Sequence, residues 1–232
     1  MRSVKGETSM KKAALFCVAG LLAVGLLTLM YIYLNSSQGE TPEESQAGPA
    51  LTAKPVIYLY PETETAVSVT LDYVGTLTTT YPAYNQGWQV TARPDGTLIN
   101  QADGREYSYL FWEGTADTAY DFSEGFVVKG SETAAFLQQA LEEMGMTPRE
   151  YNEMIVYWLP MMEGNPYNLI SFQTDCYTQL AGLSISPQPD SLLRVFMAWQ
   201  ALEEPVEVSP QELSAFERTG FTVVEWGGTQ VK

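Results

Sequence analysis

Residues 67–73, VSVTLDY, decide the fold class of the first half of the chain. From Val67 to Tyr73 the odd positions are apolar and the even positions are polar, which is the period of a half-buried β-strand. An apolar run at 56–60, VIYLY, comes just before and stops at Pro61, and further strand-like runs follow at 77–81 and 88–93. Short strands at close spacing predict an antiparallel meander or small sandwich over residues 54–113.

Residues 114–232 mix helical and strand patterns. A helix is predicted over 132–144, a short helix from Thr147, and a further helix from Ser209 to Gly220, on the basis of apolar spacing, capping residues and terminal glycines. The apolar run 154–159 is interpreted as a buried strand that stops at Pro160, and other strands are predicted at 126–128, 169–172, 192–199 and 221–226. The sequence therefore predicts an α+β fold, with the antiparallel β-rich portion 54–113 packed with the α+β portion 114–232 as one unit.

The first part of the chain has a different character. Residues 13–34, AALFCVAGLLAVGLLTLMYIYL, carry no charge, and as a helix they would span about 33 Å, enough to cross the hydrocarbon core of a membrane. Four basic residues precede the run and acidic residues follow it, so the positive-inside rule places residues 1–12 in the cytoplasm. The sequence thus predicts a single N-terminal transmembrane helix, a cytoplasmic tail at 1–12, and a protein of the cell membrane with its N-terminus inside and its C-terminal domain outside.

The stretch that follows predicts a spacer. Residues 35–53 are polar and acidic and contain glycine and proline, which indicates a flexible acidic stalk between the membrane and an extracellular domain at 54–232. A cleaved secretory signal is the alternative for the apolar run. That run is longer than a usual signal core, and no small-residue cleavage site follows Leu34.

Composition excludes several classes of function. The chain has 12 Lys and Arg against 28 Asp and Glu, and its formal net charge of −16 repels nucleic acid. It contains no histidine, which removes Ser-His-Asp and Cys-His catalysis, and Cys176 is the one cysteine after the apolar run, too few for a disulfide or a zinc site within the domain. The glycine-rich motifs of nucleotide-binding proteins do not occur.

Several motifs carry a resemblance to other proteins. KPVIYLYP at 54–61, YLFWEG at 109–114 and TGFTVVEWGG at 219–228 resemble a family of uncharacterised exported proteins that is common in clostridia-like bacteria. The resemblance implies a bacterial cell-envelope setting. It implies no activity, cofactor or site residue.

Two glutamates beside tryptophans are the candidate catalytic residues. Glu113 follows Trp112, and Glu225 precedes Trp226, each pair lying at the end of a predicted strand. Two carboxylates across a cleft can cleave a glycosidic bond, and a tryptophan wall can bind a sugar ring and raise the pKa of a neighbouring carboxyl group. The ordinary alternative is that each strand turns its tryptophan into the core and its glutamate to water.

A loop-like acidic stretch is the candidate metal site. Asp117, Asp121 and Glu124 lie close together in the sequence, and their hard oxygen atoms could hold Ca²⁺. Their spacing does not match an EF-hand loop, so a solvated acidic loop is the alternative, and no other cofactor is expected.

Two functions therefore stand at this point. The first is a non-catalytic cell-envelope binding or interaction module, anchored through residues 13–34, whose partner is a cell-wall polymer or an envelope protein. The second is a carboxylate-dependent cell-wall glycan hydrolase that uses Glu113 and Glu225. The two differ in one geometric requirement, because the hydrolase needs both carboxyl groups in one cleft about 5–10 Å apart.

Overall fold

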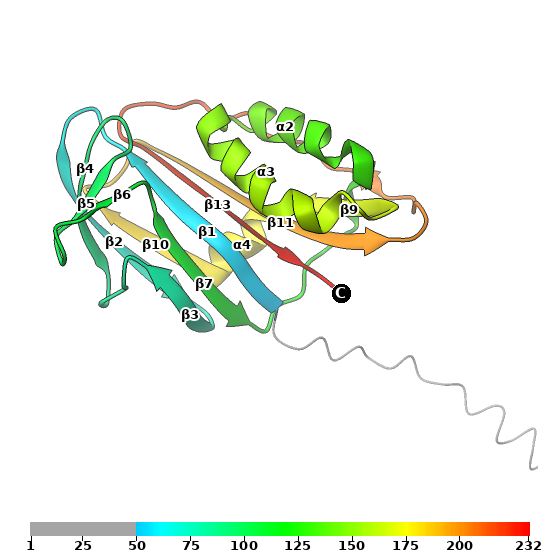
Figure 1. Ribbon diagram of the computed structural model, residues 1–232, viewed down its shortest axis with the longest axis horizontal. Coiled ribbons are helices and arrows are strands. Elements are labelled where there is room, and N and C mark those ends of the chain that lie inside the picture. The colour runs from blue at the N-terminus through cyan, green and yellow to red at the C-terminus, as the bar shows by residue number, and fades with distance from the viewer. Residues whose placement is uncertain (1–49) are drawn as a thin grey trace, which may run out of the picture. The chain divides into compact units, whose positions relative to one another are not determined.

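The computed structural model describes residues 50–232. A long twisted sheet of eight strands carries the helices α2 and α3 on one face (Figure 1). Its other face packs against a second sheet of five strands. The domain therefore has three layers, helices, large sheet and small sheet, and the large sheet lies in the middle.

The order of strands in the large sheet mixes the two halves of the sequence. The order is β12 (Ser209–Pro210), β8 (Glu124–Lys129), β9 (Tyr167–Phe172), β11 (Ser191–Leu202), β13 (Thr222–Gln230), β1 (Ala50–Tyr60), β7 (Leu110–Ala116) and β3 (Thr76–Tyr81). β1 pairs antiparallel with both β13 and β7, and β13 pairs parallel with β11. The first and last strands of the described chain are thus neighbours at the centre of the sheet.

The central strands are apolar on both sides because both of their faces are covered. Along β1, Val56 and Tyr58 join the core under the helices, whereas Ile57 and Leu59 join the core between the sheets. A strand buried on both faces shows a continuous apolar run rather than alternation, which explains the sequence VIYLY.

The small sheet follows the alternating pattern from which the fold was first inferred. Its order is β10 (Ala181–Ser186), β2 (Thr65–Tyr73), β4 (Trp88–Ala92), β5 (Leu98–Asn100) and β6 (Glu106–Tyr107). In β2, Val67 and Val69 are buried between the sheets while Ala66 and Thr70 are exposed. The strand predicted from the alternation at 67–73 is confirmed, and the sandwich-like arrangement expected for residues 54–113 extends beyond that range.

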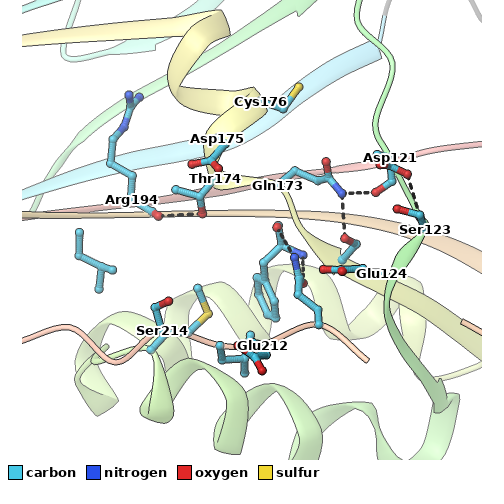
Figure 2. Close-up of a pocket in the computed structure, with 16 residues that line it drawn as sticks. Asp121, Ser123, Glu124, Gln173, Thr174, Asp175, Cys176, Arg194, Glu212 and Ser214 are labelled. Carbon is cyan, nitrogen blue, oxygen red and sulfur yellow. Dashed lines mark hydrogen bonds between the residues drawn. The ribbon is translucent and has the colours of Figure 1, made fainter. Parts of the chain in front are cut away.

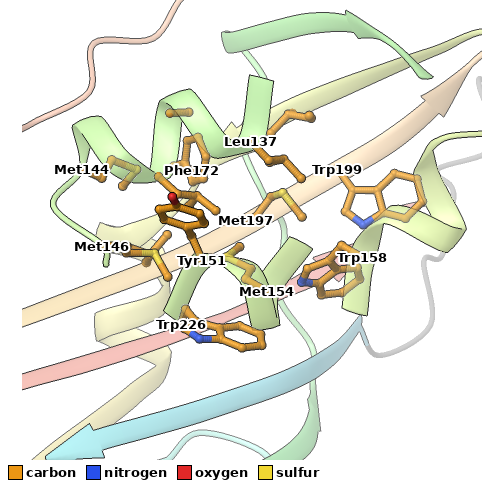
Figure 3. Close-up of a cluster of buried hydrophobic side chains, with 14 of the residues drawn as sticks. Leu137, Met144, Met146, Tyr151, Met154, Trp158, Phe172, Met197, Trp199 and Trp226 are labelled. Carbon is orange, nitrogen blue, oxygen red and sulfur yellow. The ribbon is translucent and has the colours of Figure 1, made fainter. Parts of the chain in front are cut away.

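The helical layer lies on the large sheet. A 3₁₀ turn, η1 (Gly130–Glu132), leads into α2 (Thr133–Glu143), which confirms the helix predicted at 132–144, and α3 (Pro148–Met162) follows. Figure 3 shows Leu137 of α2 and Tyr151, Met154 and Trp158 of α3 packed in one cluster with Trp226 of β13. The short helix α4 (Thr174–Leu180) precedes β10. Neither α4 nor β10 was predicted.

Residues 154–159 form part of α3, so the strand predicted there is wrong. The buried residues Tyr151, Met154, Trp158 and Met162 fall on one face of a helix, and Val156 between them is 73% exposed. The capping box of Thr147 and Glu150 and the proline at the first turn start the helix. The helix continues through Pro160 to Met162. The prediction was wrong because consecutive apolar residues at 154–159 resemble a buried strand, although only some of them belong to the buried face of the helix.

The helix predicted from Ser209 to Gly220 is also wrong. Ser209 and Pro210 form β12, and residues 211–219 have no regular secondary structure. Two side chains in this stretch bond to distant parts of the molecule instead: Gln211 to the backbone of Phe172, and Arg218 to Glu150. These tertiary bonds hold the segment extended across the helical layer. They replace the local bonds that the capping residues suggested.

The division of the domain into a portion at 54–113 and a portion at 114–232 needs correction. β1, β7 and β3 from the first portion lie in the same sheet as β8, β9, β11 and β13 from the second, and β10 of the second portion pairs with β2 of the first. The two portions share both sheets and both cores, so they are not separate packing units.

The membrane architecture is a further correction. None of the helices within residues 50–232 is long and apolar enough to cross a membrane. The tail at 1–12, the helix at 13–34 and most of the stalk lie outside the described residues, and residues 50–53 of that stalk belong to β1. The single-pass membrane fold and the localisation derived from it receive no support and are withdrawn.

Candidate functional site

Glu225 lies in a fully buried polar cluster between the two sheets. Its side chain on β13 is 0% exposed and forms an ion pair with Arg194 of the adjacent strand β11, with 2.6 Å between Nε and Oε2. Its other oxygen, Oε1, accepts hydrogen bonds from the Tyr177 hydroxyl at 2.9 Å and from Trp112 Nε1 at 3.2 Å. Every contact of the carboxylate is therefore internal.

The electrostatics of this cluster favour the charged pair. Burial is the largest single influence on the pKa of the Arg194 guanidinium and lowers it, but the Glu225 carboxylate and Tyr177 together outweigh burial and raise that pKa above its ordinary value. Burial, followed by the negative charge of Glu225, raises the pKa of Tyr177 well above its ordinary value. The guanidinium also lies over the Tyr177 ring, 4.6 Å from its centroid. The phenol is thus held neutral as a donor and the arginine is held charged.

Glu113 lies on the opposite face of the large sheet. Trp112 shares the inter-sheet side with Glu225, and successive residues of a strand point to opposite faces, so Glu113 points to the helical side. There Glu113 Oε1 accepts the backbone N–H of Lys54 at 3.2 Å. Lys54 has a positive φ of 57° at a register shift in β1, and its Nζ lies 5.4 Å from the ring centroids of Tyr109 and Phe111. The Glu113 carboxylate thus stabilises the irregular backbone of β1 at Lys54.

The two candidate catalytic glutamates are therefore not brought together. They lie on different faces of one sheet, and Glu225 has no exposed surface. Trp112 and Trp226 are both fully buried, Trp112 between the sheets and Trp226 under the helices. The alternative that each glutamate faces water also fails for Glu225, because the large sheet is covered on both sides. No cleft lined by this pair of carboxylates exists in the described chain.

An open cleft lies elsewhere, where β9 ends and α4 begins (Figure 2). Its volume is about 590 Å³. One wall comes from the segment before β8, one from the start of α4, and one from the irregular segment after β12. The lining residues are Asp121, Ser123, Glu124, Met144, Ser171, Phe172, Gln173, Thr174, Asp175, Cys176, Leu193, Arg194, Gln211, Glu212, Leu213 and Ser214.

Side-chain hydrogen bonds hold two of these walls in place. Gln173 Nε2 donates to Ser171 Oγ at 2.8 Å and to the backbone carbonyl of Asp121, which ties the first wall to the floor. Gln211 holds the wall formed by the segment after β12 against β9. Its amide accepts a hydrogen bond from the Phe172 N–H and donates one to the Phe172 carbonyl, both at 2.8 Å. This side-chain amide takes the place of a neighbouring strand beyond Phe126 and Ile170, the terminal pair of β8 and β9.

The cleft is strongly acidic. Four carboxylates line it, from Asp121, Glu124, Asp175 and Glu212, and all four residues are exposed. The backbone N–H of Ser123 donates to Asp121 Oδ1 at 2.8 Å and holds the pKa of that carboxyl below its ordinary value. The single cationic lining residue, Arg194, contributes its backbone, and its side chain leads away from Ser123 and Glu124 (Figure 2) toward its partner Glu225.

The predicted calcium ligands are only partly assembled. Asp121 and Glu124 line the cleft, but Asp117 does not. Within residues 50–232 no three Asp, Glu, Cys or His side chains come close enough together to hold a metal ion. The sequence pattern had singled out Asp121 and Glu124 as ligands of Ca²⁺. It missed Asp175 and Glu212, which lie far away in the chain and share no local pattern with them.

Comparison with known proteins gives one relative. The chain is 50% identical over 74 residues to the uncharacterized protein in the bglA 3′ region of Butyrivibrio fibrisolvens; the match covers 31% of this chain and 73% of that protein. No family model and no solved structure matches the chain. The relative is consistent with the resemblance to uncharacterised proteins of clostridia-like bacteria.

Proposed function

The chain belongs to the family of this Butyrivibrio fibrisolvens protein, and on that premise we propose that it is a non-catalytic binding protein whose acidic cleft takes a basic segment of another polypeptide. The observation that carries the proposal is the lining of the cleft by four exposed carboxylates, while Arg194, the one cationic residue that lines it within residues 50–232, directs its side chain to Glu225. Carboxylates of one sign around a concave surface focus a negative potential and attract cationic partners.

The floor of the cleft favours side chains with apolar stems. Met144, Phe172 and Leu193 are buried residues that reach the cleft from the helical core. Lysine and arginine combine a long aliphatic stem with a charged head, so the stem can pack on such a floor while the head meets the carboxylates. A basic peptide fits both features. A polyanionic polymer would be repelled, which makes a basic polypeptide the favoured partner class.

A hydrolytic function is not supported by the same geometry. Glycoside cleavage needs two carboxyl groups across one cleft, whereas Glu113 and Glu225 lie on opposite faces of the sheet. Binding alone is the function that the cleft favours.

A fragment of residues 47–232 is suitable for the test. Both hydrophobic cores are built from residues between Ala53 and Trp226, and the contacts within the chain divide it just before Ala47. The fragment therefore contains the complete set of packing interactions of the domain. It also omits the apolar run 13–34, which would bind peptides or detergent by itself.

The experiment measures binding of a fluorescein-labelled oligolysine peptide by fluorescence polarisation. We expect a variant that combines Glu124→Gln, Asp175→Asn and Glu212→Gln to bind about tenfold more weakly, since each exposed charge pair contributes up to about 1 kcal/mol. A matched control combines Glu62→Gln, Glu203→Gln and Glu204→Gln, which are exposed and lie outside the cleft. Equal weakening in the two variants would mean that only the net charge matters, and would contradict a site in the cleft.

A further inference from the structure

The strands at the free edges of the two sheets differ in how well they are protected against pairing with another chain. Unpaired strand edges invite pairing with another chain, so proteins shorten them, bend them or place charges and prolines on them. The large sheet ends in β12, which has two residues including Pro210, and in β3, which contains a bulge between Leu77 and Thr79. The small sheet ends on one side in β6, which has two residues including Glu106. Three of the four terminal strands are therefore protected.

The fourth terminal strand, β10, has none of these protections. All six of its residues, AGLSIS, pair in unbroken register with β2, from Ala181 opposite Tyr73 to Ser186 opposite Ser68. The strand contains no charge, proline or bulge, and its outward side chains at Gly182, Ser184 and Ser186 are small. A regular, uncharged edge with small side chains offers little steric or electrostatic resistance to an added strand.

The hydrogen-bonding groups of β10 are directed to the open side. Both the N–H and the carbonyl of Leu71 are bonded to the Tyr84 hydroxyl, on the side of β2 that faces β4. In an antiparallel ladder the residue opposite such a position makes no bonds to its partner, so the N–H and carbonyl of Leu183 point away from β2. Those of Ile185 do the same. No hydrogen bond from within residues 50–232 reaches these groups at Leu183 or Ile185.

The core beneath this edge is incompletely covered. The side chains of Leu183 and Ile185 pack against the core between the sheets but are only partly buried. A strand placed beyond β10 would pair with their backbones and cover their side chains at the same time. Both consequences of strand addition, hydrogen bonding and burial, are thus available at one place.

We propose that β10 is a strand-addition site for an extended basic segment of a partner polypeptide. The charge around the edge selects this occupant over a second copy of the chain. Asp72 lies opposite Gly182, and neither β2 nor β10 contains a basic residue. Two copies that each carry a net charge of −16 would repel one another, whereas a basic strand would be attracted.

This site is independent of the acidic cleft. None of the residues of β10 lines that cleft. Replacing the cleft carboxylates should therefore leave strand addition unchanged, so the failure of one proposal does not imply the failure of the other.

The test uses residues 47–232 and a synthetic peptide of alternating threonine and valine flanked by lysines. We expect amide hydrogen exchange, resolved by NMR, to slow by about tenfold or more at Leu183 and Ile185 when the peptide is added. The same peptide with alternate backbone nitrogens methylated should give no protection, because it cannot donate to the edge. Ser184→Lys should weaken binding and Ser184→Glu should strengthen it, while Thr78→Lys on the bulged edge β3 should have no effect.

Three outcomes would overturn the proposal. The first is no protection at Leu183 and Ile185 at the highest concentration at which the peptide stays soluble, whether or not the cleft binds it. The second is equal binding of the methylated peptide, which would indicate charge attraction alone. The third is concentration-dependent self-association in sedimentation with protection of β10 in the absence of peptide, which would make a second copy the occupant.

Discussion

Replacing Glu225 by glutamine tests whether a buried charge pair holds the middle layer together. The substitution keeps the volume and one acceptor oxygen for Trp112 and Tyr177, but it removes the charge that faces Arg194. The arginine is left as an unpaired cation between two sheets. Its side chain is 6% exposed and that of Glu225 is 0% exposed, so solvent screening does little to reduce the effect.

The expected magnitude follows from this burial. Removing one partner of a buried ion pair costs about 3–5 kcal/mol. Because glutamine keeps an acceptor for the two neutral donors, we expect the lower end, about 3 kcal/mol. The net stability of a typical domain is about 5–15 kcal/mol, so the loss is a large fraction of the total. With a urea dependence of about 2–3 kcal/mol per molar, the unfolding midpoint should fall by about 1 M.

The assay is urea unfolding of residues 47–232, followed by circular dichroism and tryptophan fluorescence. Glu113→Gln is the matched control and should cost less than about 1 kcal/mol, because Glu113 accepts the backbone N–H of Lys54 and the glutamine oxygen can still accept it. The double variant Arg194→Met with Glu225→Gln should recover part of the stability, since no unpaired charge remains. A single Glu225→Gln variant within about 1 kcal/mol of the original chain, or a double variant less stable than the single, would refute the reasoning.

Three further predictions concern packing, the α2–α3 junction and pH. Gly130→Ala should lower the thermal midpoint strongly because its Cβ would lie 2.1 Å from the Asn165 carbonyl, whereas Gly164→Ala, with no atom within 4 Å, should change it little in the same calorimetric scan. Arg218→Met should cost about 2 kcal/mol in urea unfolding because it leaves the buried Glu150 without its cation; an unchanged midpoint would contradict this. Burial raises the pKa of several tyrosines above the ordinary value: Tyr58, Tyr60, Tyr73, Tyr109, Tyr120, Tyr157 and Tyr177. The unfolded chain therefore loses these protons first, so stability measured by urea unfolding should fall as pH rises above about 10, and a flat profile there would contradict the burial.

The parts of the fold that could be predicted from the sequence are those set by local pattern. The alternation of Val67, Val69 and Leu71 identified β2, and the apolar spacing before Gly145 identified α2. These signals depend on one face meeting one core. They fail where apolar residues also lie on the exposed face, as in α3, whose run of apolar neighbours around Trp158 resembles a buried strand although Val156 is exposed.

The sites were less predictable because their residues come from distant parts of the chain. Glu225 was singled out for its neighbour Trp226, yet its true partners are Arg194, Trp112 and Tyr177. Two of them lie on other strands and Tyr177 lies on α4, and no local pattern reveals that these elements meet. The cleft likewise joins Asp121 to Glu212 through tertiary packing alone. The pairing of β1 with β13 and β7 sets which faces the side chains of these strands occupy, and that pairing is a property of the whole fold.

The meeting of β1 and β13 at the centre of the large sheet has a consequence for biosynthesis. Tyr58 pairs with Val224, so the middle of the sheet cannot close until almost the entire domain has been translated. Contacts of such long sequence separation form late and slowly. During translation the apolar strand VIYLY is therefore exposed without its partner strand β13. In this interval chaperones can bind the strand, or it can aggregate.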